Sequence, residues 1–233
     1  SAIAQCLVGS EMCIRDSYLA VRLSLGGSGL ASALSQTAPL RGGERMIRVI
    51  GLSKSFGEKK VLENLDLEVN GPVVLMGPSG RGKTTLLRIL MGVEQPDSGR
   101  IEGLAGRGLA AVFQEDRLCP QLTAAGNICL TGRGVTIPQA EQELRTLGFS
   151  QADLAQPVGK LSGGQKRRAA LLRALLCRQT DILLMDEPFT GMDDALVGDA
   201  AAAVVRLTAG RDALLVTHDH SAARLLRWPV VTL

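Results

Sequence analysis

This chain of 233 residues has five cysteines and only two histidines, and their arrangement argues against a disulfide framework and a metal site. The five cysteines are odd in number and form no Cys-x-x-Cys pair, which argues against a disulfide framework or a zinc site and fits a reducing cytosol. The two histidines, His218 and His220, have no convincing set of partner ligands. A transition-metal site built from protein side chains is therefore not expected.

Long apolar runs and strong charge are also missing. No stretch of the sequence approaches the roughly 20 consecutive apolar residues that cross a bilayer, so we expect membrane association to come through a partner. The formal charge of +3 is small for this length, whereas a surface that binds nucleic acid is usually strongly basic. Nucleic acid is therefore not an expected partner. The short run Lys166-Arg167-Arg168 is interpreted as the solvated face of a helix.

The beginning of the chain differs from the rest. Residues 19–39 are rich in Ser, Gly, Ala and Leu, and the stretch Gly9–Ser17 resembles translated read-through of a sequencing adapter. We expect residues 1–45 to be a non-native or disordered leader, and the native protein to begin at Met46. The length of the remaining segment, 46–233, predicts one domain or one domain with a subdomain.

From Met46 onward, apolar strand patterns alternate with helical patterns. Strands are predicted over 47–52, 61–69, 73–76, 109–113, 181–186, 212–217 and 229–232. Helices are predicted over 83–92, 138–147, 164–178, 194–208 and 219–226. Such alternation indicates an α/β fold around a mainly parallel sheet. The segment between 113 and 162 has little strand character and is interpreted as a helical insertion, a subdomain over about 115–165.

A phosphate-binding loop (P-loop) follows the predicted strand at 73–76. The pattern GxxxxGK[ST] is formed by Gly77, Pro78, Ser79, Gly80, Arg81, Gly82, Lys83 and Thr84, with Thr85 after it. Glycines let the backbone wrap around phosphates, and the free N–H groups at the start of the next helix attract an anion. Lys83 supplies a charge for the β- and γ-phosphates, and Thr84 can place its hydroxyl on Mg²⁺. This loop alone would suit kinases, GTPases and many ATPases.

Two adjacent carboxylates end the predicted strand at 181–186. Asp186 is the candidate for holding Mg²⁺, and Glu187 is the candidate general base that polarises the attacking water. Upstream, a run of Ser162, Gly163, Gly164 and Gln165 directly precedes a helix, where a serine and glycines at the helix start make a second anion-binding surface.

The run Leu161-Ser-Gly-Gly-Gln165, standing between the P-loop and Asp186, resembles the signature of the ATP-binding subunits of ATP-binding-cassette (ABC) transporters. Three further motifs agree with this resemblance in order. Gln114 resembles the glutamine that senses Mg²⁺ and faces the membrane subunit, and residues 190–193 resemble the loop that crosses the dimer interface. His218 resembles the histidine that contacts the γ-phosphate. Phe56 stands where the family places an aromatic residue that stacks on adenine. Glu187, His218 and Gln114 are thus the expected catalytic residues.

The resemblance covers 46–233 and implies a P-loop NTPase core with a mainly parallel sheet, an antiparallel β part and an α-helical subdomain. It also implies ATP and Mg²⁺ as ligands, and a head-to-tail homodimer in which the signature of one copy reaches the ATP held by the other. One departure is unexplained: the signature helix reads Lys166-Arg167-Arg168 where glutamine often interrupts the basic pair.

The run Phe113–Leu118 followed by Pro120 resembles importers of the nitrate, sulfonate and taurine group. This similarity implies transmembrane permease subunits, an extracytoplasmic solute-binding protein and a peripheral place on the cytoplasmic face of the membrane. Two alternatives stay open: the ATPase of an exporter or lipid-handling system, and a soluble ABC protein acting on ribosomes or chromosomes. The second is disfavoured because neither a second P-loop nor an extended heptad pattern occurs.

Overall fold

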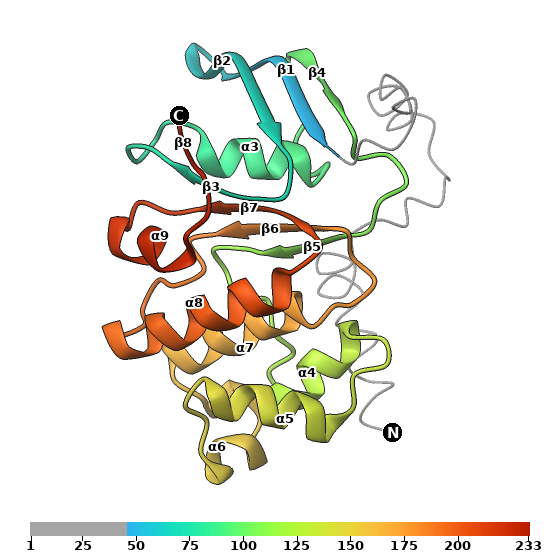
Figure 1. Cartoon of the computed structure of the whole chain (residues 1–233), viewed down its shortest axis with the longest axis vertical. Coiled ribbons are helices and arrows are strands. Elements are labelled where there is room, and N and C mark those ends of the chain that lie inside the picture. The colour runs from blue at the N-terminus through green and yellow to red at the C-terminus, as the bar shows by residue number, and fades with distance from the viewer. Residues whose placement is uncertain (1–45) are drawn as a thin grey trace.

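The computed structural model describes residues 46–233, and the elements keep the labels of Figure 1. The strands are β1 (Ile47–Phe56), β2 (Lys59–Val69), β3 (Pro72–Met76), β4 (Ser98–Glu102), β5 (Leu109–Val112), β6 (Ile182–Asp186), β7 (Asp212–Val216) and β8 (Val230–Thr232). The helices are α3 (Lys83–Leu90), α4 (Ala124–Thr131), α5 (Ile137–Thr146), α6 (Gln151–Ala155), η1 (Val158–Lys160), α7 (Gly163–Leu175), α8 (Asp194–Thr208) and α9 (His220–Leu226). The expected leader, 1–45, lies outside the described residues.

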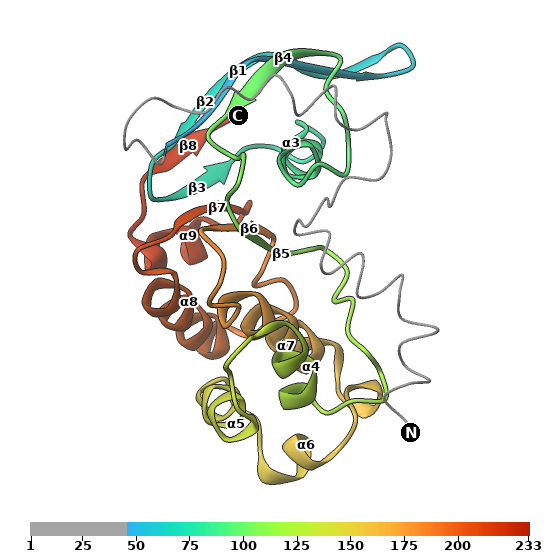
Figure 2. The same cartoon turned by 90° about the vertical axis from the view of Figure 1, so that its right-hand side faces the viewer.

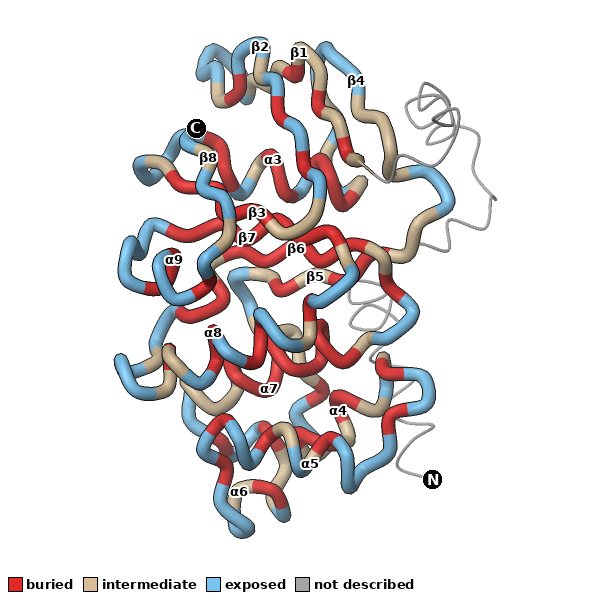
Figure 3. The backbone as a smooth tube through the Cα atoms, in the orientation of Figure 1, coloured by how far each residue is buried: buried red, intermediate tan, exposed pale blue. Residues whose placement is uncertain are grey.

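A five-stranded parallel sheet with the order β5-β6-β7-β3-β8 forms the centre of the molecule. Its four strands other than the edge strand β8 are largely apolar on both faces, as expected when helices or a second sheet cover each side. Along β6, Ile182 and Leu184 pack into one core, whereas Leu183 and Met185 pack into the other. Figure 3 shows that buried residues concentrate along these central strands and on α7. The predicted α/β class with a mainly parallel sheet is confirmed.

Two different layers cover the two faces of this sheet. Figures 1 and 2 show α3 between the parallel sheet and a three-stranded antiparallel sheet, with α7 and α8 on the opposite side. Side chains from α3, β1 and β2 share one core with the parallel strands, and side chains from α4, α5, α7, α8 and α9 share the other. The helices after the P-loop and after the signature run therefore lie on opposite faces.

The antiparallel sheet has the order β2-β1-β4 and is longer than the sequence pattern predicts. The hairpin between β1 and β2 turns at Gly57, whose φ of 60° suits glycine. Polar residues such as Lys54 and Lys60 extend both strands, because this part of the sheet is partly solvated. Strand β4 was not predicted: its residues are mostly exposed and polar, and pairing with β1, such as Ile101 with Val49, makes it a strand.

The segment between β5 and α7 forms the end of the molecule farthest from the antiparallel sheet (Figure 1). It contains α4, α5, α6 and η1, and its β structure in the described chain is limited to a single bridge between Thr123 and Pro157. The helix predicted over 138–147 corresponds to α5. Helices α4 and α6 are short, with apolar and polar residues too mixed to stand out as separate periodic segments.

Asn127, in α4, forms hydrogen bonds with the backbone of the segment between β5 and α4. Its buried amide accepts from the Cys119 N–H at 2.7 Å and donates to the carbonyl oxygens of Cys119 and Thr123 at 3.1 and 3.0 Å. We expect Asn127→Leu to lower the free energy of unfolding by about 1–3 kcal/mol, because buried backbone groups lose these partners. Urea denaturation measures this change.

The matched control is Gln142→Leu, since Gln142 is exposed on α5. It should change the free energy of unfolding by no more than about 0.5 kcal/mol. Equal stability of the Asn127 variant and the wild type would show that the amide does not hold this segment.

Among residues 46–233, no helix combines the length and the apolar composition needed to cross a bilayer.

Candidate functional site

Four motif-bearing loops meet at the same edge of the parallel sheet. The P-loop follows β3, Gln114 follows β5, Glu187 follows β6 and His218 follows β7. All these strands run parallel, so their carboxyl ends lie on one side, where α/β folds commonly bind ligands. The tertiary structure thus brings together residues that are far apart in the sequence.

The P-loop has the shape of a cradle. Gly80 and Gly82 have φ values of 82° and 88°, a left-handed backbone that favours glycine. A Cβ atom at Gly82 would lie only 2.7 Å from the Val61 carbonyl oxygen of β2. The Lys83 ammonium donates to the carbonyl oxygens of Gly77 at 2.6 Å and Pro78 at 2.9 Å. Pro78, Ser79, Gly80 and Arg81 are exposed, Gly77 and Thr85 are partly exposed, and the backbone N–H groups of α3 begin here.

Asp186 is buried at the end of β6, and the Thr84 side chain is near enough to its carboxylate to affect the pKa. Burial raises the pKa of Asp186 above its ordinary value; the Thr84 side chain and the charges of Arg167 and Lys83 oppose this shift, and Glu187 adds to it. A hydroxyl beside a carboxylate is a pair of hard oxygen donors, which suits Mg²⁺. These two residues fit the predicted ion, and Gln114 stands in the exposed loop after β5.

Glu187 is held by the residues that follow β7. Its carboxylate accepts from the Thr217 hydroxyl at 3.0 Å, and its other oxygen lies 2.7 Å from His218 Nδ1. Its N–H donates to the Val216 carbonyl oxygen, and its φ of 46° is unusual for a residue other than glycine. The Glu187 side chain is 22% exposed and that of His218 is 67% exposed, so water can reach both. A fixed, water-accessible carboxylate has the arrangement that a general base requires.

Ser162 caps the start of α7. Its hydroxyl accepts from the Gln165 N–H at 3.2 Å, while the Gln165 side chain accepts from the Ser162 N–H at 2.9 Å. Gly163 is exposed, and a Cβ atom at Gly164 would lie 3.0 Å from the Gly191 carbonyl oxygen. The signature run therefore packs against 190–193. The helices that begin at the P-loop and at the signature run, α3 and α7, lie on opposite faces of the sheet (Figure 2).

Phe56 lies at the exposed end of β1, and the Lys54 ammonium stands 5.2 Å from the centre of its ring. An exposed ring is available for stacking, and this role stays a prediction.

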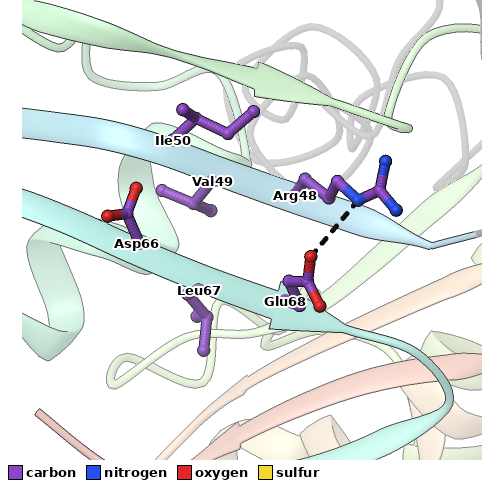
Figure 4. A pocket seen from close by; sticks show the side chains of 6 residues that line it. All are labelled: Arg48, Val49, Ile50, Asp66, Leu67 and Glu68. Carbon is purple, nitrogen blue, oxygen red and sulfur yellow. Dashed lines mark ion pairs between the residues drawn. The ribbon is translucent and has the colours of Figure 1, made fainter.

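A separate hollow of about 340 Å³ lies on the antiparallel sheet, and the Arg48–Glu68 ion pair forms part of its lining (Figure 4). It is lined by Arg48, Val49, Ile50, Asp66, Leu67 and Glu68, and contains none of the motif residues.

The expectation of a solvated face at 166–168 is wrong for two of the three residues. Arg167 and Arg168 are only 5% and 7% exposed. Arg167 donates to backbone carbonyl groups of two loops, and Arg168 lies 5.6 Å from the centre of the Phe149 ring. Thr217, which holds Glu187, was also missed, although its place beside His218 could have indicated it.

Comparisons with known proteins agree with this geometry. Residues 62–190 match the protein family described as "ABC transporter". The aliphatic sulfonates import ATP-binding protein SsuB 3 of Rhodococcus jostii is 41% identical over 185 residues, which cover 74% of this chain and 65% of that protein. The Fe(3+) ions import ATP-binding protein FbpC of Mesorhizobium japonicum is 38% identical over 198 residues, 76% of this chain and 54% of that protein. The chain thus spans less than two thirds of the length of both.

A solved structure extends the comparison to the fold. The ATP-binding cassette MJ0796, in a dimeric post-hydrolysis state bound to ADP and Pi, superposes with a TM-score of 0.67 and 26% identity, over 80% of this chain and 94% of that one. The match to the family runs from β2 past the end of β6 and includes the P-loop, the signature run and both carboxylates. Since this segment makes up more than half of the sequence, the chain belongs to the ABC transporter family.

Proposed function

We propose that this chain is the ATP-binding and ATP-hydrolysing subunit of an ABC importer. The observation that carries the proposal is the convergence, at one sheet edge, of the P-loop, the Thr84–Asp186 pair and the Glu187 carboxylate held by Thr217 and His218. These are the parts that phosphoryl transfer to water requires: a phosphate cradle, a metal-side carboxylate and a base. Loss of ATP hydrolysis on removal of Glu187 is the direct test.

The residues of the site divide the tasks of binding and hydrolysis. Lys83 exchanges the carbonyl oxygens of Gly77 and Pro78 for phosphate oxygens, whose negative charge attracts the ammonium more strongly than a neutral carbonyl does. Glu187 accepts the proton of the attacking water, and His218 keeps that carboxylate oriented and lies ready to contact the γ-phosphate. When bound, Mg²⁺ would neutralise charge on the phosphates, held by Thr84, Asp186 and Gln114.

A second copy of the chain completes the site. The Ser162 cap presents an exposed hydroxyl and glycine N–H groups at the positive end of α7, on the face of the sheet opposite to α3. A head-to-tail homodimer would place this helix start on the γ-phosphate held by the partner's P-loop. The cassette MJ0796, which shares the fold, is dimeric. Hydrolysis would then remove the charge that holds the two copies together.

The partners follow from the relatives. SsuB and FbpC are named as import ATP-binding proteins. For this chain we infer transmembrane permease subunits, an extracytoplasmic solute-binding protein and a place on the cytoplasmic face of the membrane. Co-purification of the chain with a permease encoded beside it, and stimulation of ATP hydrolysis by that permease, test these partners.

Ser162→Arg should leave ATP binding by the single chain intact and prevent ATP-driven dimerisation. A long cation at the helix start removes the cap and occupies the space that the partner's triphosphate would need. Light scattering with ATP and Mg²⁺ measures dimerisation, in a chain that also carries Glu187→Gln so that ATP persists.

Thr136→Arg is the matched control, because Thr136 caps α5 through the same reciprocal pairing, with Gln139. This control should still dimerise. Dimerisation of the Ser162 variant to the same extent would refute the placement of this residue on the partner's nucleotide.

A further inference from the structure

One buried arginine joins the two loops that carry the expected catalytic residues. Arg167 Nη2 donates to the carbonyl oxygens of Asp186 at 2.6 Å and Glu187 at 2.7 Å. Its Nη1 donates to the Phe113 carbonyl oxygen and to that of Gln114 at 3.3 Å. Since β5 and β6 are adjacent parallel strands, their ends lie side by side, and one guanidinium bridges them.

We propose that Arg167 is a positioning residue for ATP hydrolysis, which holds Glu187 and Gln114 in one fixed arrangement. This inference rests on the proposed function. The Asp186 and Glu187 carbonyl groups belong to the two peptide units on either side of the Glu187 Cα atom. By holding both, Arg167 determines the direction in which the Glu187 side chain leaves the backbone, toward Thr217 and His218.

The backbone at Glu187 needs such support. Its φ of 46° lies in the left-handed region, which is unfavourable for a residue other than glycine. The Glu187 N–H donates to the Val216 carbonyl oxygen, and Arg167 donates to the carbonyl oxygens of Asp186 and of Glu187 itself. Without the guanidinium, the peptide units can rotate and carry the carboxylate away from the attacking water.

Donating to carbonyl oxygens after β5 and at the end of β6 at the same time requires a planar, forked cation. Arginine presents N–H groups in several directions from one rigid group, whereas the lysine ammonium is a single point on a flexible stem. The Asp116 carboxylate lies 3.5 Å from Nη1 and supplies a countercharge. A cation that is 5% exposed would be costly without such partners. Both terminal nitrogens of the buried guanidinium therefore have partners.

A second arginine of α7 fastens only the first of the two loops in the contacts of the described chain. Arg173 donates to the Arg117 carbonyl oxygen at 2.5 Å and to that of Asp116 at 3.2 Å. The loop 113–117 is thus attached to α7 at both ends, and Arg167 extends the attachment to Glu187. Because Ser162 caps the same helix, α7 connects the signature run, Gln114 and Glu187.

The test compares Arg167→Met and Arg167→Lys with the wild type in the full chain with Mg²⁺. We expect turnover per bound ATP to fall about 10- to 100-fold in the methionine variant, since small misplacements of a reacting group have effects of this size. The ATP dissociation constant should change less than about threefold, because the P-loop is untouched. The lysine variant should stay at least about tenfold below wild type, because it keeps the charge but not the fork.

Arg211→Met is the matched control for structural damage. Arg211 also donates to backbone carbonyl groups, those of Leu175 at 2.9 Å and Cys177 at 3.3 Å, away from the sheet edge that carries the motifs. It should lose thermal stability but keep wild-type turnover per bound ATP. Exchange of backbone amide hydrogens gives a readout that is independent of activity. Arg167→Met should speed exchange at 113–117 and at 186–190, whereas Arg173→Met should speed it at 113–117 and leave 186–190 unchanged.

Wild-type turnover in Arg167→Met, or an equal loss in Arg211→Met, would overturn the positioning role while leaving the proposed function in place. A wild-type chain that binds no ATP would instead refute the proposed function.

Discussion

Replacing Glu187 with glutamine is expected to leave ATP binding within about threefold of wild type and to slow hydrolysis by about 10²–10⁴-fold, the range of general base catalysis. Glutamine has nearly the same shape, and its amide oxygen can still accept from the Thr217 hydroxyl, which lies 3.0 Å from the carboxylate in the wild type. It cannot accept the proton of water at neutral pH. With its ATP unhydrolysed, the variant should accumulate as a dimer that contains nucleotide.

Release of inorganic phosphate and the mass of the complex in solution measure these two effects separately. Glu141→Gln is the control, since Glu141 lies on α5 and pairs with Arg145. It should hydrolyse ATP at the wild-type rate. Normal turnover by the Glu187 variant would exclude Glu187 as the base, whereas loss of ATP binding would mean that the substitution had damaged the P-loop.

Lys83→Ala is expected to weaken ATP binding itself, by about 10- to 150-fold. This range corresponds to about 1.5–3 kcal/mol for a hydrogen bond to a charged group. In the structure, the buried ammonium donates to two carbonyl oxygens of its own loop and so points into the space that the loop encloses. With alanine there, the backbone N–H groups of the P-loop remain, but the only lysine of this loop is gone.

Equilibrium binding of a fluorescent ATP analogue measures the effect, and Lys60→Ala, at an exposed position of β2, is the control. The control should bind as wild type does. Affinity of the Lys83 variant within about twofold of wild type would place the triphosphate somewhere other than the P-loop.

The fold class and most buried strands could be predicted because their signal is local. Strand β6 (Ile182–Asp186) is apolar at every position before Asp186, a pattern typical of a sheet that is covered on both faces. Strand β4 could not be predicted, because its exposed residues carry no period and its pairing with β1 joins segments far apart in the sequence. Helices α4 and α6 were missed for a related reason: each is short and depends on packing between β5 and α7.

For the site, too, local sequence motifs could be recognised from the sequence. Chain order and residue type were sufficient to recognise the P-loop, the signature run and the Asp186–Glu187 pair, since each depends on a few consecutive residues and a backbone that they themselves favour. The roles assigned to the individual site residues, Glu187, Lys83 and Asp186 as well as Gln114, His218, Phe56 and Ser162, remain predictions.

Arg167 lies beyond the reach of such reasoning. It looks like one cation of a solvated run, yet its partners stand 54 and 20 positions away in the chain. Only the adjacency of β5 and β6 brings those carbonyl groups together under α7. The sequence by itself shows which chemical groups a residue carries. The partners of a buried charge such as that of Arg167 are backbone atoms far away in the chain, and only the tertiary structure brings them to it.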